Sequence, residues 1–107
     1  MKPMFGPLLF LGLMIFPGPA LAQDEATIKG AFIMCGTQHV LIACDDLVQM
    51  PDLNNVVRSN AYAVRAATLL RLGRVEDAKR DLDEALRLNP DNQTVIDFKA
   101  LLLEKGL

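Results

Sequence analysis

The sequence contains no tryptophan, one tyrosine and one histidine, His39. Because His39 is the only side chain that titrates near neutral pH without perturbation, acid–base catalysis would need a carboxyl group with a strongly shifted pKa, and no pattern marks one. The sequence also lacks a glycine-rich phosphate loop, a Ser–His pair and a zinc-binding helix motif. We therefore expect no catalytic residue, no metal site and no cofactor, and an enzyme is not the favoured interpretation.

A basic cluster is missing as well. The chain has 11 lysines and arginines against 13 aspartates and glutamates, for a formal net charge of −2. Nucleic acids and anionic membrane surfaces bind concentrated positive charge, which this sequence does not supply. We expect neither as a partner.

One long apolar run stands at the start of the sequence. Residues 5–16 are apolar apart from glycine and proline, Lys2 precedes them, and residues 20–22 (Ala-Leu-Ala) supply the small side chains that signal peptidase requires. A membrane anchor is the alternative, but the run is shorter than the roughly 20 apolar residues that span a bilayer. The pattern predicts a signal peptide at residues 1–22, export, and no membrane span after its removal.

Two cysteines lie in the exported part, Cys35 and Cys44. On one continuous helix they would stand about 13.5 Å apart, whereas a disulfide needs Cα atoms within about 7 Å. A bridge therefore requires the chain to turn near Gly36. An oxidising compartment favours a disulfide, while free or intermolecular thiols and a redox pair remain alternatives. A metal site with His39 would lack an evident fourth ligand.

Hydrophobic periodicity predicts an all-α protein. We expect a helix from Asp24 towards Cys35, a second over 40–49, a third from about 56 to 72, a fourth over 75–88 and a last one over 93–105. Gly73 can take the left-handed conformation that ends a helix. The polar side of the fourth helix, Asp81 included, is interpreted as a solvated face with Glu76–Arg80 and Asp83–Arg87 pairs.

Residues 59–92 resemble the tetratricopeptide repeat, a helical hairpin of 34 residues. Small residues fall where two helices must approach, large ones fill the space between them, and a glycine and a proline stand at the two turns. The residues that carry the resemblance are Tyr62, Ala66, Leu69, Gly73, Ala78, Leu82, Ala85 and Pro90. The resemblance implies about one and a half repeats with short flanking helices.

Position 65 carries an arginine where the general repeat pattern prefers leucine. In this respect the sequence resembles an exported bacterial subgroup of the family, which also carries two cysteines in the segment before the repeat. The resemblance therefore implies a bacterial periplasmic protein with a Cys35–Cys44 disulfide. Residues 23–58 would be a decayed repeat. Residues 93–107 would be a C-terminal capping helix, with Ile96, Ala100 and Leu103 at the aromatic, small and bulky repeat positions.

The family holds partners on the inner face of its first helix. Here that face comprises Asn60, Ala63, Val64, Ala67, Leu70 and Arg71, and it is either covered by flanking helices or open to a partner. A second candidate surface, Phe98, Leu101 and Leu102, lies on the last helix and suggests either self-association or docking to a partner. We expect an adaptor that binds a protein or peptide of the cell envelope. The alternative is a self-associating structural protein without a separate ligand.

Overall fold

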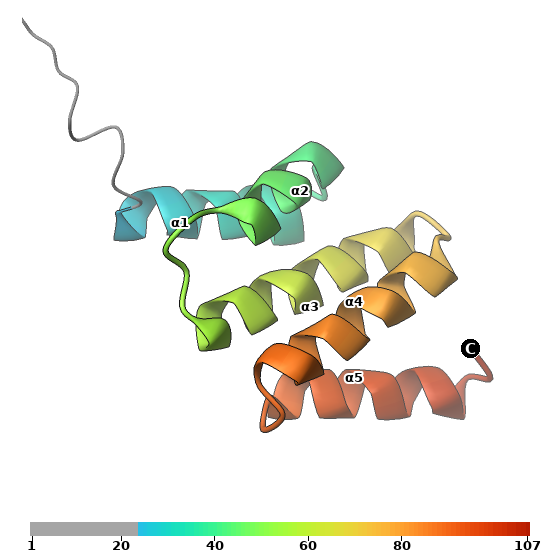
Figure 1. Ribbon diagram of the computed structural model, residues 1–107. Coiled ribbons are helices and arrows are strands. Elements are labelled where there is room, and N and C mark those ends of the chain that lie inside the picture. The colour runs from blue at the N-terminus through green and yellow to red at the C-terminus, as the bar shows by residue number, and fades with distance from the viewer. Residues whose placement is uncertain (1–23) are drawn as a thin grey trace, which may run out of the picture.

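The computed structural model describes residues 24–107, so the predicted signal peptide lies outside the described residues. These residues form five α-helices and one π-helical segment and contain no strand. The elements are α1 (Glu25–Phe32), η2 (Ile33–Thr37), α2 (Leu41–Gln49), α3 (Asn55–Arg71), α4 (Val75–Leu88) and α5 (Gln93–Glu104). In Figure 1, α1 and α2 lie on one side of α3, and α4 and then α5 lie on the other.

The predicted first helix is present but ends differently. The Asp24 carboxylate accepts a hydrogen bond from the Thr27 backbone N–H at 2.8 Å, which caps α1 as its N-cap residue. The helix then widens into η2, and Cys35 lies in this π-helical turn rather than in regular α-helix. His39 follows with φ 56°, a left-handed residue that reverses the chain before α2.

The predicted hairpin is confirmed by α3 and α4. Asn54 caps α3 through the Val57 backbone N–H, and Gly73 turns the chain with φ 78°. Ala66, Ala78 and Ala85 are each 0% exposed. Because these residues end at a methyl group, the two helix backbones can approach closely along the whole hairpin.

Two apolar clusters stabilise the domain. The main cluster joins α3, α4 and α5, and the second cluster joins η2, α2 and α3 around the two cysteines; Tyr62 packs against both. The members of the main cluster are Ala63, Ala66, Leu69, Ala78, Leu82, Ala85, Val95 and Leu102. The members of the second cluster are Cys35, Cys44, Leu47, Val48 and Ala61.

Buried polar groups connect α3, α4 and α5 where the hairpin ends. The Ser59 hydroxyl donates to the Ala85 carbonyl at 2.7 Å, and the Asn92 amide Nδ2 donates to Ser59 Oγ at 2.8 Å. Asn92 also caps α5 by accepting from the Val95 backbone N–H. Since both polar side chains are buried and bonded, they fix the turn after α4 without leaving an unsatisfied group.

The ion pairs predicted on α4 are wrong in their partners. Glu76 pairs with Lys79, Asp77 pairs with Arg80, and Glu84 pairs with Arg87, all three residues apart rather than four. Neighbours at both spacings lie on one helix face, so the sequence alone does not choose between them. These exposed pairs contribute little to stability.

Candidate protein-binding site

A groove of about 640 Å³ opens between α1 and the start of α3. Ile28 and Phe32 from α1 form one wall, Val57 and Asn60 from α3 form the other, and Leu53 contributes from the connecting loop. Polar and charged side chains complete the lining: Glu25, Lys29, Asp52 and Asn54. The volume lies in the range of ligand-binding clefts.

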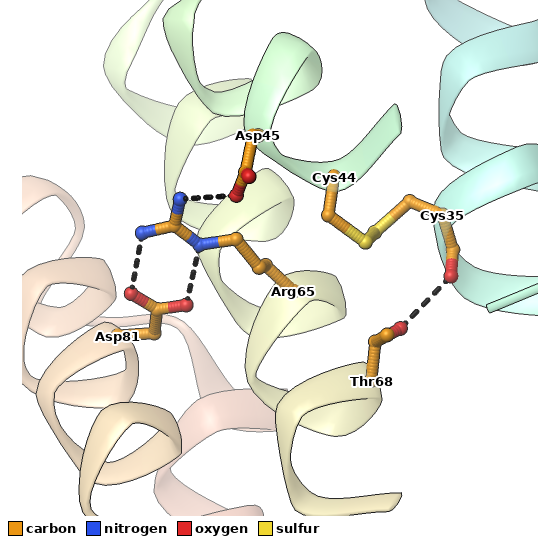
Figure 2. Close-up of a disulfide and its surroundings, with 6 residues drawn as sticks. All are labelled: Cys35, Cys44, Asp45, Arg65, Thr68 and Asp81. Carbon is orange, nitrogen blue, oxygen red and sulfur yellow. Dashed lines mark hydrogen bonds and ion pairs between the residues drawn. A yellow bond between two sulfur atoms is a disulfide. The ribbon is translucent and has the colours of Figure 1, made fainter. Parts of the chain in front are cut away.

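The wall formed by α1 is held at one end by the disulfide. The structure contains the predicted Cys35–Cys44 bond, with the Cα atoms 4.7 Å apart and both residues fully buried. The Thr68 hydroxyl donates to the Cys35 carbonyl at 2.8 Å, which joins η2 to α3 (Figure 2). The C-terminal end of α1 is thus attached to α2 by a covalent bond and to α3 by a buried hydrogen bond.

Gly36 allows η2 to approach α3. A Cβ atom placed at Gly36 would stand 2.9 Å from Val64 Cγ1, closer than such atoms pack. A larger residue here would therefore force Val64 or η2 to shift. The same contact means that η2 covers part of the inner face of α3.

An arginine joins three helices beside the disulfide. Arg65 of α3 donates to the Asp81 carboxylate of α4 through Nε at 2.8 Å and Nη2 at 2.9 Å, and to Asp45 of α2 through Nη1 at 3.1 Å (Figure 2). The guanidinium carbon also lies 5.4 Å from the centre of the Tyr62 ring. The hydrogen bonds to Asp81, the largest cause, and to Asp45 raise the pKa of Arg65 above its ordinary value. The arginine therefore stays charged and fixes α2 relative to the hairpin.

The prediction that Asp81 lies on the solvated face of α4 is wrong. Its side chain is buried, with the residue 5% exposed, and it accepts two hydrogen bonds from Arg65. The arginine at position 65 could have indicated the burial of Asp81, because an arginine among buried positions needs a carboxylate partner.

Asn60 is a polar groove residue whose side-chain orientation is set by a hydrogen bond. Its Oδ1 accepts from Asn92 Nδ2 at 2.9 Å. Among residues 24–107 its own Nδ2 donates to no other residue. A fixed amide donor beside an apolar wall suits the carbonyl oxygen of a bound polypeptide.

The predicted inner face of α3 is divided by the structure. Asn60 lines the groove and Arg71 is exposed, whereas Ala63 is buried in the main cluster. Val64 is half-buried beneath η2. Ala67 and Leu70 are half-buried as well. Only the N-terminal part of the face therefore borders the groove, because η2 and α2 cover the middle of α3.

The predicted surface on α5 is also divided. Leu102 is 3% exposed and belongs to the main cluster, so its assignment as a docking residue is corrected. Phe98 is half-buried against the same cluster, and Leu101 is exposed. The reason is the rotation of α5, which turns Val95, Phe98 and Leu102 towards α4.

Apart from Asn60, none of the groove residues was predicted as a partner contact. The apolar pair from α1 is Ile28 and Phe32. Their four-residue spacing placed both on one face of the first helix, but nothing in the pattern indicated that this face would stand opposite Val57. That juxtaposition depends on the turn at η2 and on the disulfide.

Residues 24–107 hold no group of three or more histidine, cysteine, aspartate or glutamate side chains placed to bind a metal ion. None of its helices combines the length and apolar character needed to cross a bilayer.

Comparison with known proteins agrees with the hairpin geometry. The family model described as the tetratricopeptide repeat matches residues 59–92. Neither the curated proteins nor the solved structures give a match. The matched residues coincide with most of α3, all of α4 and the turn that follows it. The chain therefore contains a tetratricopeptide repeat at residues 59–92.

Proposed function

We propose that this protein is a non-enzymatic adaptor of the bacterial cell envelope that binds a segment of another polypeptide in the groove between α1 and α3. The observation that carries the proposal is the groove itself, with the apolar side chains of Phe32 and Val57 on facing walls and the amide of Asn60 beside them. The repeat at residues 59–92 supports it, because such repeats suggest a protein-interaction scaffold.

The groove lining favours an extended segment with an apolar anchor. Ile28, Phe32 and Val57 offer carbon surface to one apolar side chain, and burying such a side chain contributes roughly 1.5–3 kcal/mol. Asn60 Nδ2 is placed to donate to a backbone carbonyl of the segment. Because one apolar anchor supplies only part of the binding free energy, we expect modest selectivity for the side chain and a micromolar rather than nanomolar affinity.

Two features support the proposed location in the cell envelope. The apolar run before residue 23 has the pattern of an export signal, and a buried disulfide suits an oxidising compartment. Both features support a periplasmic site of action.

A selection experiment tests the proposal. A displayed library of random peptides is selected on the wild-type protein, and the binding of the enriched peptides is measured by calorimetry. We expect binding to be weakened at least tenfold by Val57→Lys and to be unchanged by Leu72→Lys, a matched apolar-to-charged change at an exposed position at the other end of α3. Peptides that bind both variants equally would show that the groove is not the binding site.

A further inference from the structure

An apolar stripe remains uncovered on α5. Ile96 is 40% exposed and Leu103 is 75% exposed, and Ala100 is exposed between them. These residues stand at i, i+4 and i+7, so they share one helix face. No other element among the described residues covers this face, because α4 packs against the side that carries Val95 and Leu102.

The stripe has the same arrangement as the packed face of α3. Thirty-four residues earlier, Tyr62, Ala66 and Leu69 stand at the corresponding repeat positions, where they pack against the main cluster. On α3 this large–small–large pattern packs against a neighbouring helix. The same pattern on α5 could therefore pack against a helix as well.

The charges beside the stripe distinguish between occupants. At 100° per residue, Lys99 lies on one side of the stripe and Glu104 on the other, on the same side as Asp97. When two copies of a helix pack in parallel, a residue that flanks the seam on one helix lies next to a residue of the other helix. That second residue is five positions later in the sequence and flanks the seam on the opposite side. Lys99 of each copy would therefore meet Glu104 of the other, which forms two symmetrical ion pairs.

An antiparallel pair would bring like charges together. In that arrangement the same sides of the two helices face each other, so Asp97 of one copy would approach Glu104 of the other. We propose that the stripe is occupied by α5 of a second copy of this chain, in parallel orientation about a two-fold axis along the helix. Ile96, Ala100 and Leu103 of the two copies then form the seam.

The two charged side chains that would form these ion pairs are accessible. Glu104 is exposed, and Lys99 is 41% exposed while its Nζ lies 2.6 Å from Asp83. An ammonium group has three donors, so this intramolecular pair leaves Lys99 able to bind Glu104 of a second copy. The groove between α1 and α3 is formed by other elements, so self-association leaves it open.

Analytical ultracentrifugation over a range of concentrations tests the seam. We expect a reversible monomer–dimer equilibrium for the wild-type protein and a monomer for Leu103→Glu. Leu72→Glu, the matched change at another exposed leucine, should retain the wild-type dissociation constant. Circular dichroism verifies that each variant is folded. A wild-type monomer at the highest soluble concentration, or an unchanged dimer of Leu103→Glu, would overturn the proposal.

Charge reversal tests the orientation. In the parallel dimer Glu104→Lys places two lysines together, and we expect the dissociation constant to rise about tenfold, while Lys99→Glu combined with Glu104→Lys restores it. In an antiparallel dimer Glu104→Lys would instead remove the repulsion from Asp97 and tighten association, which would refute the parallel arrangement. Val57→Lys, which removes the proposed peptide site, should leave the dissociation constant unchanged, so the two proposals can fail separately.

Discussion

Replacement of Arg65 by methionine is predicted to destabilise the fold far more than an exposed ion pair would suggest. Methionine retains the apolar stem but leaves the Asp81 carboxylate, whose side chain is 8% exposed, without the two donors it now has at 2.8 and 2.9 Å. Loss of one partner of a buried pair costs roughly 3–5 kcal/mol. Since the Arg65 side chain is itself 21% exposed, we expect a value near the lower limit, about 3 kcal/mol.

Two companion variants test whether the unpaired Asp81 carboxylate causes this loss of stability. Asp45→Ala removes the outer partner, whose side chain is 49% exposed, and should cost less than about 1 kcal/mol. Arg65→Met combined with Asp81→Leu removes both buried charges and should regain most of the lost stability, because apolar side chains can replace a buried ion pair.

Urea unfolding followed by circular dichroism measures these free energies. For a domain of this size, a loss of 3 kcal/mol corresponds to a fall in Tm of roughly 12–24 °C. If Arg65→Met costs less than about 1 kcal/mol, or if the double variant is less stable than the single one, the interpretation of Arg65 as the link between α2, α3 and α4 is wrong.

Three further predictions concern the disulfide, two glycines and an ion pair on α4. Serine at both cysteines should lower the free energy of unfolding by about 2.5–3 kcal/mol, the loop-closure value for this separation, in a urea titration. Gly36→Ala should destabilise the fold through its contact with Val64, whereas Gly30→Ala, which meets nothing within 4 Å in α1, should stabilise it by up to about 1 kcal/mol; equal effects on the melting temperature would contradict the close approach. A hydrogen bond from Arg87, the largest cause, lowers the pKa of Glu84, so its stabilising effect is present above the unfolded-state pKa and is lost as pH falls through the folded-state value. An NMR titration of Arg87→Ala should therefore show the pKa of Glu84 rising, and an unchanged value would refute the pairing.

The hairpin was predictable because its determinants are local. Ala78 and Ala85 repeat at helical spacing, and Gly73 and Asn54 mark helix boundaries by their own conformational preferences. Each of these signals depends on the residue and its near neighbours along the chain. The structure therefore confirmed the all-α fold and the helical repeat.

The groove was not predictable to the same degree because it depends on contacts between distant segments. Ile28 and Val57 face each other only after η2 has turned the chain and the disulfide has joined it to α2. The burial of Asp81 likewise depends on Arg65, which lies sixteen residues earlier. Periodicity assigns a charged residue to the solvent side of a helix, and only the tertiary partner reverses that assignment.

Whether the groove between α1 and α3 holds a segment of another polypeptide can be measured by site-specific photo-crosslinking in an exporting bacterium. The photoreactive side chain is placed at Val57 in the groove or at Leu72 outside it. We expect a discrete crosslinked protein from position 57 that is absent from position 72. No adduct from position 57, or the same adducts from both positions, would contradict it.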